Sequence, residues 1–319
     1  MKLACVGNAL YDIIAFVETD FASSLGFHAG STVHVDRSEL EPLLSALPGI
    51  TGNAGGGALN VAKVFSCLGY QSAFAGMIGT DEFGKSFRKE IMSAGIEDKL
   101  QECDRPTGVF VVLIAPDGSR TIAVAPGAAP FLDASAIPDS FFGHDSVLYI
   151  DGFLAASTET ISILVSRAEA AGMRIALDIA GYRIAQAKRN FFKDLIHTSC
   201  SWTFMNEDEF IALSESGVDE SLARFSAEVP GIIVVKRAEI GAVCVSSGNL
   251  YQSAVRPIRA TDTTGAGDAF AAGFLSAALA GATLPRCLRL GNRIAEHAIQ
   301  VPGMSVDTTI LKRATAAVL

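Results

Sequence analysis

The sequence has little positive charge and no cluster of it. Lysine and arginine together number 25 against 34 acidic residues, which gives a net charge of −9, and the basic residues are scattered along the chain. Binding along a nucleic acid needs clustered cations that replace the counterions of the phosphate backbone. We therefore expect no nucleic-acid partner, and a phosphate-bearing ligand would have to find positive potential at helix N-termini or at a metal ion.

Long hydrophobic runs and paired cysteine motifs are also lacking. Half of the residues are hydrophobic, yet no stretch approaches the roughly 18 apolar residues that a membrane-spanning helix requires. The six cysteines are scattered without a C-x-x-C pair, which is typical of a reduced protein. The opening residues, MKLACVGNALYD, offer no apolar core for a signal peptide. These features predict a soluble, cytoplasmic protein with no membrane partner.

The sequence does contain a regular alternation of apolar strands and helical segments. From residue 147 onward the runs VLYID, RIALD, WTFMN and GIIVVK are each separated by a stretch with helical spacing. Such alternation is typical of βαβ units, in which right-handed crossovers place helices against a parallel sheet. Because the length suits one α/β unit, the sequence predicts a single domain over residues 1–319.

Two segments near the N-terminal end do not follow this alternation. Residues 11–36 contain two extended runs, and residues 105–125 contain two apolar strands separated by the turn-forming residues PDGS. Neither segment easily joins a parallel sheet. We expect them to pair with each other as a small β-sheet lid over the ligand end of the main sheet.

One candidate phosphate loop is GTDEFGKS, at Gly79–Ser86, which matches the P-loop pattern GxxxxGK[ST]. A P-loop presents consecutive backbone N–H groups to phosphate oxygens. Here Asp81 and Glu82 bring two negative charges into the loop. The pattern is equally compatible with a tight turn into a helix, with Asp81 or Thr80 near its N-cap and Lys85 on a solvated face. A P-loop NTPase is the less favoured interpretation.

A second candidate is TDTTGAGDAF, at residues 261–270. From Ala269 onward the residues are apolar or small, which predicts a helix buried on every side. The N-terminus of such a helix has free N–H groups and the positive end of the dipole, and Gly265–Gly267 leave room for a phosphate to approach them. Asp268 falls in the first turn, where an acid either caps the helix or acts on a bound ligand.

DTTGAGDAF resembles the C-terminal signature of the ribokinase-like (PfkB-type) family of carbohydrate and nucleoside kinases, and GGGALNVA at residues 55–62 is similar to the family's GG-x-x-x-N-x-A element. The stretch CLGYQSAFAGMIGTDEFGKSF resembles an ordinary βα unit of the family. The resemblance covers residues 2–305. It implies a three-layer α/β/α sandwich with a mostly parallel central sheet and a small β-sheet lid, and an ATP-dependent transfer of the γ-phosphoryl group to an alcohol.

The resemblance also implies a role for each matching residue on the acceptor side. Asp268 would be the general base, kept ionised at neutral pH by the helix N-terminus. The backbone amides around it would form an anion hole for the transferred group; they belong to Gly265, Ala266 and Gly267. The positions that match substrate-contacting residues are Asp12, Gly56, Gly57 and Asn60.

On the nucleotide side the resemblance implies ATP and Mg²⁺ as cofactors. Asn206 and Glu209 match an N-x-x-E element whose acid organises magnesium through water, although the same spacing is also a helix capping box. VVKRAEIGAV departs from the family's T-x-G-x-x-G form: Gly241 matches the second glycine, but Lys236 replaces a small or hydroxyl residue and is expected to compensate by contacting phosphate. Asn292 matches a residue beside the adenine.

The resemblance adds K⁺ as a candidate cofactor. Asp262 and Thr264, with Gly303 further on, fall where many relatives bind a monovalent cation. Whether a cation activates this chain is left open by the sequence.

The acceptor is less closely defined. GNALYD, DFASSLGFHAGS and YIDGFL resemble the adenosine-kinase-like branch more than typical sugar kinases. Three apolar lid residues either form a wall for a nucleobase or simply bury the lid; they are Phe16, Phe110 and Ile122. The sequence thus predicts a nucleoside or sugar with a primary hydroxyl, and a hexose or ketose such as fructose is the alternative. Both a monomer and a homodimer remain open.

Overall fold

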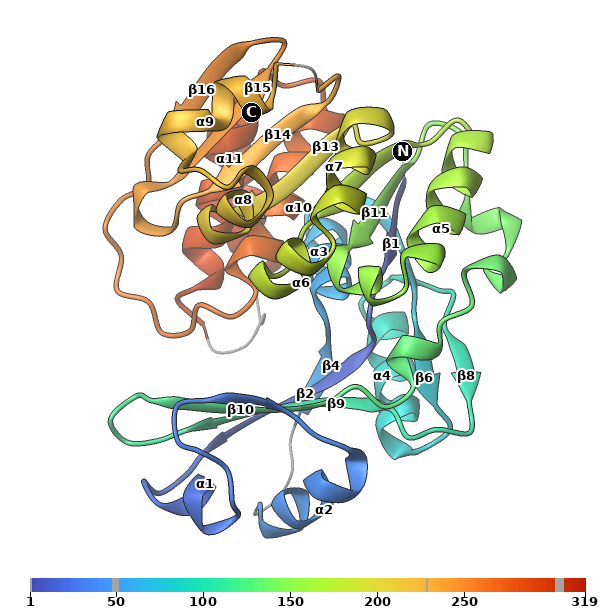
Figure 1. The fold of residues 1–319 in the computed structure, drawn as a ribbon, viewed down its shortest axis with the longest axis vertical. Coiled ribbons are helices and arrows are strands. Elements are labelled where there is room, and N and C mark those ends of the chain that lie inside the picture. Colours follow the sequence, from blue (N-terminus) through green and yellow to red (C-terminus); the bar gives the residue numbers. More distant parts are fainter. Residues whose placement is uncertain (1, 48–51, 228, 302–306) are drawn as a thin grey trace.

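A large, mostly parallel sheet forms the centre of the computed structural model, which describes residues 2–47, 52–227, 229–301 and 307–319 (Figure 1). Most neighbouring strands of this sheet run parallel, and a hairpin of two antiparallel strands extends it at one edge. In spatial order the strands are β16 (Asn249–Ser253), β15 (Ala242–Ser246), β14 (Ile232–Lys236), β13 (Trp202–Asn206), β12 (Arg174–Asp178), β11 (Val147–Asp151), β1 (Lys2–Val6), β5 (Gln71–Ala75) and β7 (Glu97–Asp98).

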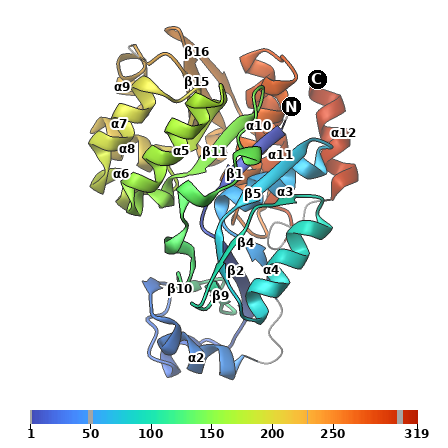
Figure 2. The ribbon, with the colours of Figure 1, turned by 90° about the vertical axis from the view of Figure 1, so that its right-hand side faces the viewer.

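Helices cover both faces of this sheet, because successive residues of its buried strands face opposite sides. In β1, Leu3 and Cys5 belong to one hydrophobic core, whereas Ala4 and Val6 belong to the other. Figure 2 shows the two helical layers edge-on. One layer contains α5 (Thr158–Ala170), α6 (Tyr182–Ala187), α7 (Arg189–Thr198), α8 (Glu207–Ser214) and α9 (Val218–Phe225); the other contains α3 (Gly57–Cys67), α4 (Glu82–Ser93), α10 (Ala266–Leu279), α11 (Leu284–Ala298) and α12 (Thr308–Val318). The three-layer α/β/α prediction is confirmed.

A second, smaller sheet lies beyond one end of the large one (Figure 1). Its strand order is β3 (Thr32–His34), β10 (Arg120–Ala125), β9 (Gly108–Ile114), β2 (Leu10–Phe16) and β4 (Gly52–Gly55). It has a hydrophobic core of its own, in which strand residues such as Ile13 and Val111 pack with Leu40 and Leu43 of α2 (Arg37–Ala46). The short helix α1 (Phe21–Ser24) covers the same side. We call this unit the small sheet.

The pairing within the small sheet joins segments that are distant in the sequence. β2 runs parallel to β9, and β3 runs parallel to β10, so the segments 11–36 and 105–125 do pair with each other. The small sheet also contains β4, a segment in which the sequence shows a cluster of glycines and predicts no strand. Glycine is depleted in strands, and β4 exists because its backbone pairs antiparallel with β2.

The remaining elements are short. A two-stranded parallel sheet joins β6 (Met77–Gly79) to β8 (Gln101–Cys103). Single 3₁₀ turns span Ala129–Phe131, Ala134–Ala136, Asp139–Phe141, Gly152–Ala156 and Ala238–Ile240. Within the ranges that the structure describes, no helix combines the length and the hydropathy that crossing a membrane requires.

Candidate active site

A cavity of about 430 Å³ lies between the large sheet and the small sheet. On one side it is lined by the last residues of three strands of the large sheet, namely Asp151, Asp178 and Lys236. Parallel strands bring their carboxyl ends to one edge, which is where α/β sheets commonly bind ligands. On the other side it is lined by residues of the small sheet, among them Asp12 and Phe110.

Most of the residues that the sequence predicts for the site meet at this cavity, although they come from distant parts of the chain. Those that line it are Asp12, Gly56, Gly57, Asn60, Glu209, Lys236, Thr264, Gly265 and Asp268. Ala266 and Gly267 follow directly in the first turn of α10. Four other predicted residues lie away from the cavity wall: Asn206, Gly241, Asp262 and Asn292.

The first turns of α3 and α10 meet at the floor of the cavity. Gly265 is the N-cap of α10 and has a left-handed backbone with φ 74°, a conformation that glycine adopts without a steric penalty. From Ala269 to Ala277 every residue of α10 is buried, which fixes the helix rigidly beneath the site. The amide of Asn60, in α3, donates a hydrogen bond from Nδ2 to Oδ2 of Asp268 at 2.9 Å. The Asp268 carboxylate is therefore held at a defined position.

Burial of the carboxyl group raises the pKa of Asp268 to about 7. The hydrogen bond from Asn60 and the attraction of Lys236 lower this pKa, whereas the repulsion of Asp178 and Asp151 raises it. The sequence predicts that the helix N-terminus keeps Asp268 ionised near neutral pH, whereas burial disfavours the charged form of this carboxyl group. At neutral pH the group is close to the midpoint of its titration.

The glycine run before α3 leaves room for two carboxylates. A Cβ atom on Gly55 would lie 2.0 Å from Oδ2 of Asp12, and one on Gly57 would lie 3.3 Å from Oδ1 of Asp268. Between them, Gly56 has φ 104°, and a Cβ there would lie 2.2 Å from the carbonyl oxygen of Asn8. The run therefore allows the backbone to turn tightly while Asp12 and Asp268 face the same cavity. Burial also raises the pKa of Asp12 to about 7.

Two acids of the cavity wall, Asp151 and Asp178, are absent from the residues that the sequence predicts for the site. Oδ1 of Asp151 accepts a hydrogen bond from the N–H of Phe153, and burial raises the pKa of Asp151 to about 6. Oδ2 of Asp178 accepts hydrogen bonds from Lys236 Nζ at 2.8 Å and from the Tyr149 hydroxyl at 3.2 Å. The sequence does carry a signal for both, since each is a carboxylate at the end of an apolar strand.

Glu209 lies deeper in the cavity wall and is 4% exposed. Glu209 closes the capping box at the start of α8. The backbone N–H of Asn206 donates to Oε2 of Glu209 at 2.8 Å, and the side-chain Nδ2 of Asn206 donates to Oε1 of Glu209 at 2.9 Å. Burial raises the pKa of Glu209 to about 7, and the attraction of Lys236 opposes this rise. The structural role of this pair is thus present, and Glu209 in addition faces the cavity.

The pfkB family of carbohydrate kinases matches residues 1–310 of this chain. The chain belongs to the pfkB family. Adenosine kinase from Schizosaccharomyces pombe is 24% identical over 94% of this chain and 94% of its own length. A probable sugar kinase from Rhizobium etli CFN 42 has the same fold with a TM-score of 0.88, at 27% identity over 99% of this chain and 98% of the other. Adenosine kinase from Sinorhizobium meliloti follows with a TM-score of 0.85, at 27% identity over 100% and 99%.

Membership of the family settles the class of reaction. This pfkB protein is a sugar or nucleoside kinase that uses ATP as the phosphoryl donor. The cavity between its two sheets is lined by residues of both family motifs, and it is therefore the candidate active site.

Two of the predicted nucleotide-side residues of this pfkB kinase shape the edge of the large sheet. Asn292 is 5% exposed, and its Nδ2 donates to the carbonyl oxygen of Ser253 at the end of β16. Gly241 has φ 108°, and a Cβ there would lie 2.1 Å from the same carbonyl oxygen. Both residues hold the chain where it leaves β16 and runs toward the first turn of α10.

Asp262 is buried and meets a residue of the small sheet. Arg120 Nη1, on β10, lies 3.3 Å from Oδ1 of Asp262, and the N–H of Thr264 donates to the same oxygen at 3.0 Å. The pair links the small sheet directly to the loop that precedes α10. Gly303, the other residue predicted near a monovalent cation, lies outside the described residues.

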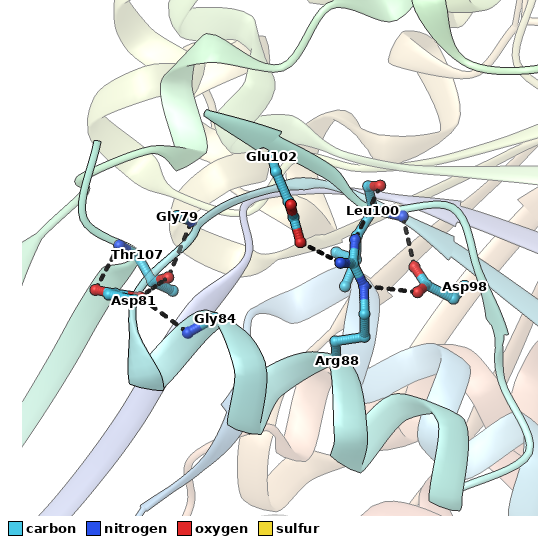
Figure 3. A network of polar contacts seen from close by, with 8 residues as sticks. All are labelled: Gly79, Asp81, Gly84, Arg88, Asp98, Leu100, Glu102 and Thr107. Carbon is cyan, nitrogen blue, oxygen red and sulfur yellow. Dashed lines mark hydrogen bonds and ion pairs between the residues drawn. The ribbon is translucent and has the colours of Figure 1, made fainter. Parts of the chain in front are cut away.

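The loop Gly79–Ser86 is not a phosphate site of this pfkB kinase. Asp81 caps α4: its Oδ1 accepts from the N–H of Gly84 at 3.0 Å, and its Oδ2 accepts from the N–H of Thr107 at 3.1 Å (Figure 3). The Thr107 hydroxyl in turn accepts from the N–H of Gly79 at 3.0 Å. Lys85 is 67% exposed and pairs with Glu82. The tight-turn interpretation is confirmed, since the loop's own carboxylate caps the first turn of α4 and accepts from the amide of Gly84.

Proposed function

We propose that this pfkB kinase phosphorylates the primary hydroxyl of a nucleoside of the adenosine type. The observation that supports this most strongly is that Asp268, beside the N-terminus of α10, shares one cavity with Asp12 and with the aromatic ring of Phe110. The cavity thus offers a base, a carboxylate for sugar hydroxyls and an apolar wall. The adenosine kinases from Schizosaccharomyces pombe and Sinorhizobium meliloti both match this chain over nearly its whole length.

Asp268 acts as the general base. Its carboxylate accepts the proton of the acceptor hydroxyl while that oxygen forms a bond to the γ-phosphorus of ATP, and the bond between the γ-phosphorus and the bridging oxygen of ADP breaks. A pKa of about 7 suits this role, because the group is ionised often enough to act and basic enough to take the proton. Asn60 holds the carboxylate in place.

The first turn of α10 forms the anion hole. Gly265, Ala266 and Gly267 expose backbone amides at the positive end of a buried helix, where charge on the transferred group is stabilised. The N–H of Ala266 also donates to the carbonyl oxygen of Thr263 at 3.2 Å, so this amide shares its hydrogen with the loop. The hole needs no reorganisation during the reaction, because α10 is fixed by burial.

The acceptor lies between the small sheet and the glycine run. Asp12 accepts hydrogen bonds from the sugar hydroxyls, and the amide of Asn60 can both donate to them and accept from them. Gly56 and Gly57 allow the sugar to approach the backbone. Of the three lid residues for which the sequence leaves two roles open, Phe110 lines the cavity, and Phe153 joins it there. Phe16 does not, since it is 79% exposed at the far end of β2. We propose that the small sheet closes over the acceptor as a lid.

The nucleotide lies along the ends of β13 and β14, near Asn206, Lys236 and Thr264, with Gly241 and Asn292 shaping the path of the chain beside it. The described residues hold no group of three acids or histidines spaced to grip a metal by themselves. That suits Mg²⁺, which commonly keeps several waters and binds mainly through nucleotide phosphates. Glu209 would hold such a water, and the ion would neutralise charge on the transferred phosphoryl group.

For K⁺ the candidate position remains beside Asp262 and Thr264. The guanidinium of Arg120 already lies against the Asp262 carboxylate, so a cation there would compete with it for the same oxygen.

We place the kinase in the cytoplasm, where its ATP donor is abundant.

The experiment that tests this proposal is a panel of acceptors, assayed by ADP formation with the purified chain, ATP and Mg²⁺. The panel contains purine and pyrimidine nucleosides, ribose, fructose and glucose. Adenosine or a close purine nucleoside is expected to give the highest kcat/KM. A preference for fructose or another free sugar would overturn the nucleoside assignment. If no acceptor of the panel supports ADP formation, the proposal as a whole is overturned.

A further inference from the structure

Lys236, the last residue of β14, has a position that its role as an ion-pair partner does not explain. Its side chain is 17% exposed, and its ammonium nitrogen lies 2.8 Å from Oδ2 of Asp178. On its other side it faces the first turn of α10: a Cβ placed on Gly267 would lie 3.1 Å from Lys236 Nζ. The ammonium group therefore lies directly against the backbone that we assign to the anion hole.

The charges around the cavity make this lysine exceptional. Of the lining residues that the structure describes, the carboxylates are Asp12, Asp151, Asp178, Glu209 and Asp268, and Lys236 is the one lysine or arginine. Burial works to lower the pKa of Lys236, but the attraction of Asp178 and Glu209 outweighs it, and the pKa is raised above the ordinary value for lysine. Lys236 therefore remains protonated at neutral pH.

An acid-rich cavity repels the phosphates of a nucleotide unless positive charge lies at the same point. The dipole of α10 supplies one part of that charge, and Lys236 stands beside the same helix turn. β14 is held on both sides, by β13 and by β15, so the backbone that carries the lysine is fixed. Its four-carbon stem allows the ammonium group to move from a carboxylate to a neighbouring oxygen.

We propose that Lys236 is a catalytic residue that contacts an oxygen of the phosphoryl group being transferred. This inference rests on the proposed function, which places that group at the first turn of α10. On nucleotide binding the ammonium group shares its hydrogen bonds between Asp178 and the phosphoryl oxygen. It keeps its protons throughout: the acceptor proton goes to Asp268, the new bond joins the acceptor oxygen to the γ-phosphorus, and ADP departs with the electrons of the broken bond.

The competing explanation is that Lys236 only neutralises Asp178. A pair of variants separates the two. In Lys236→Met the Asp178 carboxylate loses its partner, which is costly for any buried ion pair. In Lys236→Met/Asp178→Asn both charges are removed together and the net charge of the protein is unchanged. If the lysine is only a partner of Asp178, the double variant regains what the single variant loses.

The measurement is calorimetric binding of AMP and of the non-hydrolysable ATP analogue AMP-PNP, each with Mg²⁺, together with kcat for the preferred acceptor. We expect Lys236→Met to weaken AMP-PNP binding by about 10- to 100-fold, because a charge-assisted hydrogen bond is lost, and to leave AMP binding nearly unchanged. The double variant is expected to stay impaired, and Lys236→Arg to recover part of the affinity and of kcat.

Arg237→Gln serves as the matched control. It removes a cation from the adjacent residue, whose side chain pairs with Glu207 and Asp219 and does not line the cavity. This variant is expected to keep wild-type affinity and kcat.

Wild-type AMP-PNP binding in either the single or the double variant would overturn the proposal. If the single variant does not fold, the double variant, which leaves no unpaired Asp178, supplies the result. Because the binding measurement needs no acceptor, it reports on Lys236 even if the acceptor panel shows no turnover, so the two proposals fail separately.

Discussion

The carboxyl group of Asp268 shows how the site is set at the scale of single residues. Burial raises its pKa to about 7, while a hydrogen bond from Asn60 and the nearby charge of Lys236 pull in the opposite direction. Asp12, across the cavity, is raised to about 7 by burial as well. A carboxylate in solvent is a much weaker base, so the enclosure of Asp268 supports the role as general base that we propose for it.

The pH dependence of the reaction follows from these values. The base acts when it is deprotonated, so kcat/KM should fall as the pH drops below about 7, by roughly tenfold per unit once the group is mostly protonated. Asn60→Ala removes a hydrogen bond that lowers the pKa of Asp268, so the acidic limb of the profile should move to higher pH. The check is a profile of kcat/KM from pH 5.5 to 9 for both proteins, in which an unmoved limb would speak against Asp268 as the titrating base.

At the scale of elements, two glycine-containing loops each lead into a helix and differ in what their backbone amides contact. In the loop before α4 the amide of Gly84 donates to Asp81 and that of Gly79 donates to the Thr107 hydroxyl, whereas the loop before α10 contains only small residues at Gly265–Gly267. A helix N-terminus binds phosphate only when its own side chains leave it free. This difference supports a structural role for the better-known motif and the proposed anion hole at the other one.

The cap at α4 can be tested directly. Asp81→Ala removes the acceptor for the amides of Gly84 and Thr107, so it should destabilise the protein by about 1–2 kcal/mol, which is the usual cost of a lost N-cap. Its kcat should equal that of the wild type, because the loop does not line the cavity. Thermal unfolding and steady-state kinetics measure the two effects, with Lys85→Ala as a control expected to change neither. Loss of kcat in a folded Asp81→Ala protein would contradict the structural role.

The sequence predicted the elements that local patterns encode and missed those that depend on distant partners. The helix α10 and its glycine loop follow from a switch in composition at Gly267 and from the family signature. β4 was not predicted, because its pairing with β2 supplies what its glycines lack in propensity. Asp151 and Asp178 each end an apolar strand, but the sequence alone does not show which strand ends reach the cavity; the pairing of β11 with β12 does.

At the scale of the whole molecule, the two sheets enclose a cavity in which several carboxylates resist ionisation. The folded-state pKa values of Asp12, Glu209 and Asp268 are each raised to about 7, and that of Asp151 to about 6. In the unfolded chain these groups titrate near their ordinary values of about 4. Between those limits the folded state binds more protons than the unfolded state, so folding is favoured as the pH falls.

The melting temperature should therefore be higher at pH 6 than at pH 8, by a few degrees. The gain in folding stability begins as the pH drops through about 7 and is complete below the ordinary range of carboxyl pKa values. Scanning calorimetry over this range measures it. Asp268→Asn removes one contributor, so its melting temperature should rise less between the same two pH values. A melting temperature that is constant or falls from pH 8 to pH 6 would contradict the raised pKa values of these enclosed carboxyl groups.

The central claim is that Asp268 moves the proton during phosphoryl transfer, and Asp268→Asn tests it most directly. Asparagine keeps the size of the side chain and cannot take a proton. The measurement is the rate of transfer from ATP to the preferred acceptor at saturation, in a variant whose folding and ADP binding match the wild type. The account predicts a fall in kcat of about 100-fold or more. An Asp268→Asn variant that keeps the wild-type rate would contradict the account. The contradiction would be strongest if Lys85→Ala abolished phosphoryl transfer at the same time.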